Sequence, residues 1–273
     1  MPLDVTAIAR ELLSAYDART VVASQPTARD AQFDMTAAYA VEAEIVRLGR
    51  ARGRRPVGRK VGLANRALWK VMKIDTLAWA TMYDDSVCHA VDGHATWTLG
   101  PRLSPRIEPE IVFKLKSALT TGTDDPAAAL AAVEWIALGF EIIDCPFSNW
   151  KFQPADFVAA FGFHAGLVIG TPVAVTPDLI PILAEALPSF TLRLSQGGDL
   201  VEEGSGRNVL RSPALCLGEL AGAAARQSSS TPLAAGEIIT TGALTAPQPI
   251  TRGEVWRAEA VGLDLGPLTL AFQ

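Results

Sequence analysis

The stretch Arg106-Ile107-Glu108-Pro109-Glu110-Ile111-Val112-Phe113 places two acidic residues, one position apart, inside an apolar run typical of a β-strand. Side chains at positions i and i+2 of a strand point to the same face, so Glu108 and Glu110 are expected to lie side by side. Two such carboxylates repel each other unless a cation or a shared proton lies between them. The alternative is a solvent-facing edge strand, where the pair costs little and where Pro109 also fits.

A third acid, Glu141, stands alone in the run Ala137-Leu138-Gly139-Phe140-Glu141-Ile142-Ile143, which is also strand-like. Three carboxylates in apolar strands supply the oxygen ligands that Mg²⁺ or Mn²⁺ takes, with positions left for water or substrate. The sequence therefore predicts a site in which Glu108, Glu110 and Glu141 bind Mg²⁺ or Mn²⁺.

The composition is that of a well-packed globular protein: 273 residues, 49% hydrophobic and 19% charged. The formal net charge of −5 offers no basic surface, which argues against nucleic acid as a partner. No secretion signal and no apolar run near the ~20 residues of a membrane span are present, so no membrane partner is expected. The odd, widely spaced Cys88, Cys145 and Cys216 are typical of free thiols in the cytoplasm.

Apolar spacing and capping residues such as Asp4 and Asp34 predict helices over residues 4–20, 34–52, 64–73, 126–136 and 213–227. Strand-like runs cover 58–63, 79–85, 106–113, 137–143, 158–170, 190–194, 236–244, 255–260 and 268–272. Between them, the turn at Asp92-Gly93 predicts a hairpin with His89 and His94 on the surface.

Lys60 stands in the short run Gly58-Arg59-Lys60-Val61-Gly62. Its flanking glycines permit close approach of another backbone or a ligand, although an exposed edge lysine fits the spacing equally well. Asp84 and Asp85 end the next apolar run, where they either begin a turn or pair with Lys60.

Two further residues are candidates for substrate contacts. Thr241 precedes Gly242 at the end of a strand-like run, where its hydroxyl and the backbone amides could bind a carboxylate; the alternative is an ordinary strand end. His164 is the only polar side chain of residues 158–170, which is usual for a hydrogen-bonded core histidine, with substrate contact as the alternative.

These pieces, in this order and over nearly the whole chain, resemble the fumarylacetoacetate hydrolase superfamily. The closer resemblance is to its branch of 2-oxopent-4-enoate hydratases and 4-oxalocrotonate decarboxylases. The resemblance implies an α+β fold, a β-rich mixed-sheet roll with N-terminal helices, and a homo-oligomer. We divide the chain accordingly into an N-terminal helical segment, residues 1–56, and a catalytic domain, residues 57–273.

The resemblance also implies roles for particular residues. Glu108, Glu110 and Glu141 fall on the family's metal ligands, Lys60 on its lysine, and Asp85 on its second catalytic residue, with Asp84 as the second choice. The expected activity is a metal-dependent hydro-lyase acting on a 2-hydroxy-dienoate or 2-oxo-enoate, a small 2-oxo acid of aromatic or related catabolism. A decarboxylase or carbon–carbon hydrolase is the alternative within the fold, and a non-enzymatic small-acid binding protein is the alternative outside enzymes.

One segment departs from the resemblance. The hydratases and decarboxylases usually carry Asp-Asn-x-Ser where this chain reads Ala160-Phe161-Gly162-Phe163-His164. Because residues 161 and 163 of a strand face the same side, Phe161 and Phe163 are predicted to line the substrate pocket together. That pair would favour a 2-oxo acid with a hydrophobic tail, and His164 would then point into the core.

Overall fold

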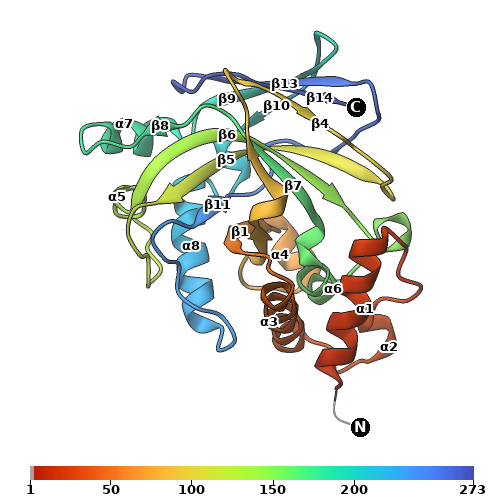
Figure 1. The fold of residues 1–273 in the computed structure, drawn as a ribbon. Coiled ribbons are helices and arrows are strands. Elements are labelled where there is room, and N and C mark those ends of the chain that lie inside the picture. Colours follow the sequence, from red (N-terminus) through yellow and green to blue (C-terminus); the bar gives the residue numbers. More distant parts are fainter. Residues whose placement is uncertain (1–2) are drawn as a thin grey trace.

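The computed structural model describes residues 3–273, and two curved β-sheets dominate it (Figure 1). Within these residues the first sheet has the strand order β2-β1-β11-β5-β6-β7-β3, with β12 pairing with β5 and β8 with β6; the second has the order β10-β9-β13-β14-β4. Both sheets mix parallel and antiparallel neighbours, since β1 runs parallel to β11 and β14 parallel to β4. The predicted α+β, mixed-sheet fold with N-terminal helices is confirmed.

The strands of the first sheet are β1 (Pro56–Gly62), β2 (Ala78–Tyr83), β3 (Val87–His89), β5 (Pro105–Leu115), β6 (Val133–Asp144), β7 (His164–Ile169), β8 (Val173–Ala174), β11 (Ile238–Thr240) and β12 (Gln248–Pro249). The strands of the second sheet are β4 (His94–Trp97), β9 (Thr191–Gln196), β10 (Asp199–Ser205), β13 (Val255–Val261) and β14 (Leu268–Phe272).

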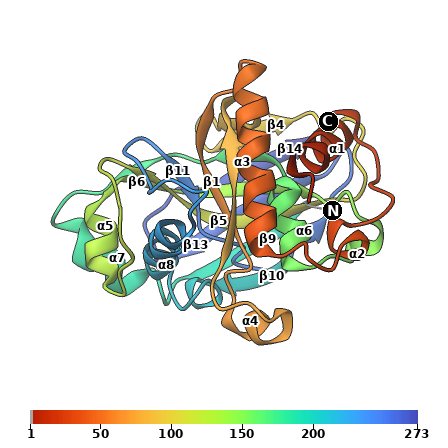
Figure 2. The same cartoon turned by 90° about the horizontal axis from the view of Figure 1, so that it is seen from below.

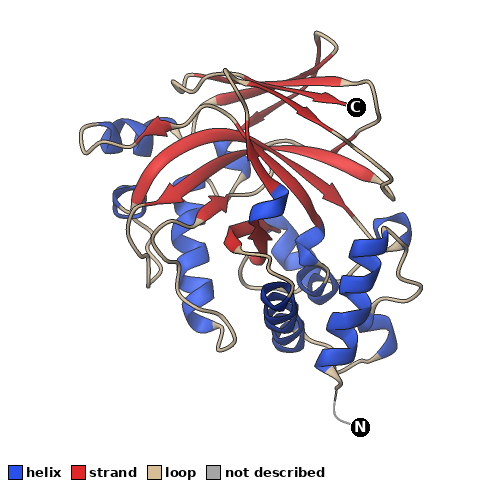
Figure 3. Ribbon diagram, in the orientation of Figure 1, coloured by secondary structure: helices blue, strands red, loops and turns tan. Residues whose placement is uncertain are grey.

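The α-helices are α1 (Val5–Ala18), α2 (Pro26–Arg29), α3 (Met35–Ala51), α4 (Arg66–Met72), α5 (Pro126–Ala131), α6 (Pro154–Ala159), α7 (Leu179–Ala186) and α8 (Pro213–Arg226). Most of them lie on the side of the first sheet that faces away from the second sheet (Figure 3). Seen from below, α3, α6 and α8 lie across the first sheet (Figure 2).

The helix boundaries follow from capping side chains. Asp4 accepts a hydrogen bond from the Ala7 amide at the start of α1, and Asp34 accepts one from the Ala37 amide at the start of α3. Helix α5 ends at Ala131, five residues before its predicted end, because the apolar residues after it enter β6. There they pair with the far end of β5, and this sheet burial outweighs helix propensity.

The predicted strand over residues 158–170 is wrong in its first half. Residues up to Ala159 end helix α6, and a single turn of 3₁₀-helix over Phe161–Phe163 follows before β7 begins at His164. Phe161, Gly162 and Phe163 all have φ near +60°, in the left-handed region that side chains rarely occupy. An apolar run alone does not distinguish such a buried turn from a strand.

The N-terminal helices are tied to the rest of the chain. Thr27 donates through its amide and its hydroxyl to the buried carboxylate of Asp156, and the ring of Tyr16 stacks on Phe161 at 4.4 Å. The division of the chain at residue 56 stays a prediction. No helix within residues 3–273 is long and apolar enough to cross a membrane.

Candidate metal and substrate site

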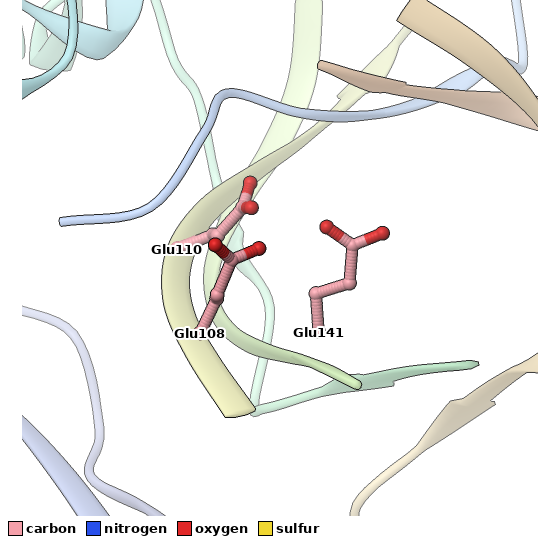
Figure 4. A group of neighbouring side chains, drawn as sticks. All are labelled: Glu108, Glu110 and Glu141. Carbon is pink, nitrogen blue, oxygen red and sulfur yellow. The ribbon is translucent and has the colours of Figure 1, made fainter. Parts of the chain in front are cut away.

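The long antiparallel pair of β5 and β6 carries the three acids. Glu108 and Glu110 share one face of β5, and Glu141 of β6 lies directly opposite Glu108 in the register. Glu110 lies opposite Gly139, whose missing side chain leaves room for those of Val112 and Leu167. One ligand oxygen from each carboxylate lies within 4.8 Å of the others, and Figure 4 shows the three side chains on neighbouring strands. The structure thus brings the three predicted residues together.

Lys60 joins this cluster because the sheet curls. On a flat sheet the backbones of β1 and β6 would lie about 14 Å apart, with β11 and β5 between them. The curvature visible in Figure 1 closes this distance on the concave face, and Lys60 Nζ lies 3.1 Å from Glu141 Oε2. Both side chains are almost completely buried, so the alternative of an exposed edge lysine is wrong.

The left-handed turn before β7 fixes the position of Lys60. Lys60 Nζ donates a 2.8 Å hydrogen bond to the carbonyl oxygen of Gly162. A Cβ on Gly162 would lie 2.7 Å from the Lys60 side chain, so the turn needs a glycine at this point. Of the two glycines that flank Lys60, Gly58 permits the predicted close approach of a backbone, that of Ile238, whereas Gly62 gives room to the side chain of Phe157.

His164 holds Glu141 from the other side. Its Nδ1 lies 2.7 Å from Glu141 Oε1, and its Nε2 lies 3.0 Å from the hydroxyl of Ser86. The histidine is only 3% exposed, which confirms the interpretation as a hydrogen-bonded core residue. A histidine that orients a ligand carboxylate in this way resembles the supporting contacts of known metal sites.

The two acids of β5 are poorly stabilised as anions. Burial and the charge of Glu141 raise the pKa of Glu108 to about 7, partly offset by Lys60 and Arg106. Burial and the charges of Glu141 and Glu108 raise the pKa of Glu110 well above its usual range. A cation between them would remove this penalty, because it favours the ionised form of each group.

Glu141 behaves in the opposite way. Burial alone would raise its pKa, but the positive charge of Lys60 and the hydrogen bond from His164 lower it. Burial would likewise lower the pKa of Lys60, but the charges of Glu141, Glu108 and Glu110 raise it. Lys60 and Glu141 therefore form a buried ion pair.

The donor set fits a hard divalent cation. Glu110 Oε1 and Glu141 Oε2 are buried and accept no hydrogen bond from residues 3–273, although Lys60 Nζ lies beside the latter. The second oxygen of Glu110 is already held at 2.7 Å by the Gly242 amide. Buried carboxylate oxygens without partners are rare in proteins, and an oxygen-liganded cation would satisfy both.

A cavity of about 560 Å³ opens onto this cluster. Its polar end includes Lys60 and Glu108. Aromatic side chains form part of its wall, namely Trp150, Phe152, Phe157 and Phe163, and the segment Gly242 to Pro247 also borders it. The volume suits a small organic acid, since ligand pockets commonly span about 300–1,000 Å³.

The predicted pairing of Lys60 with Asp85 is wrong. Asp85 lies beyond the end of β2, and its two carboxylate oxygens accept hydrogen bonds from Arg54, each at 2.8 Å. Asp84 is held by Arg55 in the same turn. Neither acid borders the cavity, so Asp85 has no position from which to act as a catalytic residue, and the turn alternative holds for both.

The predicted substrate contact through the Thr241 hydroxyl is also wrong. Thr241 is fully buried, and both its amide and its hydroxyl donate to the carbonyl oxygen of Ile111. Strand β11 ends at Thr240, so Thr241 no longer follows the alternation of a regular strand. The amide of the next residue, Gly242, donates its hydrogen bond to Glu110 and not to a substrate.

Phe161 and Phe163 do not act as a pair. Because they belong to a left-handed turn and not to a strand, Phe161 packs on Tyr16 whereas Phe163 borders the cavity beside Phe157 and Phe152. The prediction for Phe163 is compatible with the structure, and that for Phe161 is not. The sequence had no signal for the Gly162 carbonyl or the Gly242 amide, because backbone groups carry no residue-type signature.

The comparisons with known proteins agree with this geometry. A 4-oxalocrotonate decarboxylase from a Pseudomonas species is 33% identical over 212 residues, which cover 78% of this chain and 77% of that protein. A 2-keto-4-pentenoate hydratase from Dechloromonas aromatica is 29% identical and covers 84% of both chains. No model of a protein family matches the chain.

A solved structure resembles the whole fold. It is the 4-oxalocrotonate decarboxylase from Pseudomonas putida G7, complexed with magnesium and adipate, with a TM-score of 0.87 at 26% identity. The match covers 98% of this chain and 97% of that one. The chain therefore belongs to the fumarylacetoacetate hydrolase superfamily, in the branch that contains the 4-oxalocrotonate decarboxylases and the 2-keto-4-pentenoate hydratases.

Proposed function

We propose that this chain is a divalent-metal-dependent hydro-lyase that hydrates a 2-hydroxy-dienoate or 2-oxo-enoate in aromatic or related catabolism. The observation that carries the proposal is the convergence of three carboxylates, two of them fully buried with an oxygen that accepts no hydrogen bond from residues 3–273, beside a buried lysine at one end of a cavity. Relatives named as hydratases support it, with 29% identity over 84% of the chain in one case.

Glu108, Glu110 and Glu141 would hold the cation, Mg²⁺ or Mn²⁺. A relative of the same fold is complexed with magnesium, which supports this choice. Such an ion polarises the 2-oxo group of an acid bound to it and stabilises the enolate form. Gly242 and His164 contribute by fixing the orientation of Glu110 and Glu141, respectively.

Lys60 is the proposed proton carrier. Its ammonium group is anchored by the Gly162 carbonyl and by Glu141, and it lines the cavity where the substrate would lie. From there it would donate to the 2-oxo oxygen, which becomes negative when water adds at C4 of the 2-oxo-enoate. It would then deliver a proton to C3 and recover a proton from the added water. Aromatic side chains form one wall of the cavity beside this charged end.

The test replaces Lys60 with methionine. We expect Lys60→Met to lower kcat by about 10²- to 10⁴-fold, as the loss of a general acid–base does. Metal affinity should not fall, because an ammonium group has no lone pair to offer a cation. Turnover of 2-hydroxypenta-2,4-dienoate with added Mg²⁺ or Mn²⁺ is followed by the loss of its ultraviolet absorbance.

Lys114→Met is the matched control, because Lys114 also pairs with a glutamate, Glu134, but at a partly exposed position outside the cavity. A Lys60→Met enzyme that keeps most of the parent rate would make the residue structural. A parent protein that binds the acid with metal but never turns it over would favour the non-enzymatic binding protein.

Decarboxylation is the second candidate activity. It is favoured by the 33% identical relative named 4-oxalocrotonate decarboxylase, which shares the same branch. The enolate that leads to hydration is also the species formed when a carboxylate leaves as CO₂, so the same residues serve either outcome. Measuring released CO₂ alongside the loss of absorbance separates the two.

The proposal also includes a cytoplasmic homo-oligomer. Three cysteines without disulfides within residues 3–273 support a reducing compartment. Partly buried apolar side chains of the first sheet, among them Val57, Val87 and Trp135, are compatible with a subunit contact. Light scattering of the purified chain tests this directly, since a monomeric mass would contradict it.

A further inference from the structure

The peptide unit between Thr241 and Gly242 lies just after the end of β11 and orients Glu110. Glu110 Oε2 accepts a 2.7 Å hydrogen bond from the Gly242 amide, whereas Glu110 Oε1 is buried and accepts none from residues 3–273. This amide therefore decides which oxygen of Glu110 stays available to a cation. The orientation of one peptide plane thus sets the geometry of a proposed metal ligand.

Gly242 by itself leaves this orientation open. Its φ is +99°, a conformation that glycine adopts about as readily as those with negative φ. The peptide before a glycine can rotate as a rigid plane, because only the ψ of Thr241 and the φ of Gly242 need to change. Such a flip would turn a carbonyl oxygen toward the carboxylate of Glu110, so that two acceptors would face each other. Other contacts must therefore hold the peptide in place.

Thr241 fixes the peptide on one side. Its amide and its hydroxyl both donate to the carbonyl oxygen of Ile111, at 3.2 Å and 3.0 Å. Ile111 follows Glu110 directly on β5, so this anchor lies one residue from the acid that the peptide orients. The side chain thus adds a second hydrogen bond to the one that the backbone of a strand end can offer.

Cys216 fixes the same peptide on the other side. Its thiol, in α8, donates to the carbonyl oxygen of Thr241 at 3.1 Å. The peptide is trans, so its C=O and its N–H point in opposite directions. The peptide plane is therefore held at both ends, by Cys216 at its oxygen and by Glu110 at its nitrogen.

These contacts lie behind the cavity and not in it. Thr241, Cys216 and Glu110 are each 0% exposed, and Gly242 borders the cavity whereas Thr241 and Cys216 do not. Bulk water does not reach the two donors, so a donor that is removed has no ready substitute. An effect of either residue on the site must consequently pass through the peptide.

We infer that Thr241 and Cys216 are positioning residues of the metal site. Together they fix the peptide so that the Gly242 amide occupies one oxygen of Glu110 and leaves the other for the cation. Neither residue touches the cation or the substrate. The inference rests on the proposed function only in taking Glu110 as a metal ligand.

The experiment titrates the metal-free proteins with Mn²⁺ by calorimetry. Thr241→Val keeps the shape and the amide of residue 241 but lacks its hydroxyl, and Cys216→Ala lacks the thiol. We expect each to lower Mn²⁺ affinity by about 3- to 10-fold, less than the roughly 10- to 100-fold typical of a direct contact to a ligand. Thr241→Ser and Cys216→Ser keep a donor and should retain most of the parent affinity. Parent affinity in both Thr241→Val and Cys216→Ala would overturn the inference.

Cys145→Ala is the matched control. Cys145 is also buried, and its thiol also donates to a carbonyl oxygen, that of Phe147 at 3.6 Å, but it does not border the cavity. This variant should keep the parent Mn²⁺ affinity. Adding Thr241→Val to Glu110→Gln should cause no further loss, because the peptide then has no ligand to orient. A loss in Cys145→Ala equal to that in Cys216→Ala, or full additivity with Glu110→Gln, would overturn the inference.

A second readout needs no metal. Hydrogen exchange of the Gly242 amide, followed by NMR in the presence of a chelator, reports directly on its bond to Glu110. Exchange should be at least about tenfold faster in Thr241→Val and Cys216→Ala than in the parent, with the serine variants close to the parent. If the parent binds no Mn²⁺, the proposed function fails, and this readout still decides the inference: exchange as slow as in the parent would overturn it.

Discussion

The two strands that carry the acid cluster hold their charges in opposite ways. On β5, burial and the charge of Glu141 raise the pKa values of both Glu108 and Glu110. On β6, Glu141 is fully buried, but Lys60 and His164 lower its pKa. Without a cation, one strand favours protonated acids and the other favours a permanent anion.

This difference indicates how the site is assembled. Glu141 belongs to a charged network that exists before any metal binds, because its partners come from β1 and β7 of the same sheet. Glu108 and Glu110 acquire a favourable charged form only when a cation arrives. The β6 acid thus has charged partners within the protein, whereas the β5 acids would gain theirs from the proposed cation.

Replacing Glu141 should give the largest effect. Glu141→Gln leaves the buried Lys60 ammonium without its closest counter-charge, which should cost about 3–5 kcal/mol in the free energy of unfolding of the metal-free protein. It should also weaken Mn²⁺ binding. Urea denaturation in the presence of a chelator measures the first effect; stability equal to that of the parent would mean that the ion pair contributes nothing to folding.

Glu110→Gln sharpens the comparison, because it removes a ligand without breaking an ion pair. The amide oxygen can still accept from the Gly242 amide, and the lost charge was itself unfavourable. We expect the metal-free protein to change by less than about 1 kcal/mol, while Mn²⁺ affinity falls by about tenfold or more. If Glu110→Gln destabilises the metal-free protein as strongly as Glu141→Gln, the two strands do not differ in the way described.

His164 should have an intermediate effect. His164→Phe removes the donor that orients Glu141, and the loss of such a supporting contact typically costs about 10- to 100-fold in metal affinity. His164→Gln, which retains a donor on a side chain of similar reach, should recover part of that affinity. If His164 served only for packing, both variants would lose stability and their Mn²⁺ affinity would stay at the parent value.

The same contrast explains how much the sequence could predict. Glu108, Glu110 and Glu141 lie on a regular antiparallel pair, where the two-residue repeat fixes which side chains share a face. The predicted acid partner of Lys60 is wrong, because the actual partner, Glu141, belongs to a strand three positions away in the sheet. The two side chains meet only because the sheet is curved. Sequence periodicity carries no information about that curvature.

The segment 160–164 shows a second feature that the sequence pattern could not predict. Its apolar residues were consistent with a strand, but left-handed conformations at Phe161, Gly162 and Phe163 turn successive side chains in unrelated directions. Among these residues only Gly162 carries a sequence hint of such a turn, since non-glycine residues seldom adopt it. The predicted roles of Asp85 and Thr241 are wrong for a related reason. Asp85 pairs with Arg54, and the Thr241 hydroxyl donates to the Ile111 carbonyl, so neither side chain is directed into the cavity.

The smallest predicted effect distinguishes the two phenylalanines of that turn. Phe163→Ser should change the substrate preference by a few fold, because one face of its ring borders the cavity and contributes about 25 cal/mol per Å² of apolar contact. Phe161→Ser should leave the preference unchanged and lower stability, since its ring packs on Tyr16. Comparing kcat/KM for short and long-tailed dienoates in the two variants measures this, and equal shifts in both would contradict the assignment.

The most direct test of the central claim, that these three acids form a divalent cation site, is a calorimetric titration of the metal-free protein with Mn²⁺ at pH 6 and pH 8. The pKa of Glu108 lies at about 7, above the ordinary 4.5, so the folded metal-free protein holds extra protons at pH 6. The stability that this protonated form contributes is complete below pH 4.5 and is lost as the pH rises through about 7.

Because a ligand carboxylate must be ionised, Mn²⁺ binding should release protons at pH 6, release fewer at pH 8 and be tighter at pH 8. Proton release is obtained by repeating each titration in two buffers of different ionisation enthalpy. We expect one Mn²⁺ per chain, with this pH dependence and with weaker binding in Glu110→Gln. The absence of saturable binding, or an affinity that is the same at both pH values and in Glu110→Gln, would contradict it.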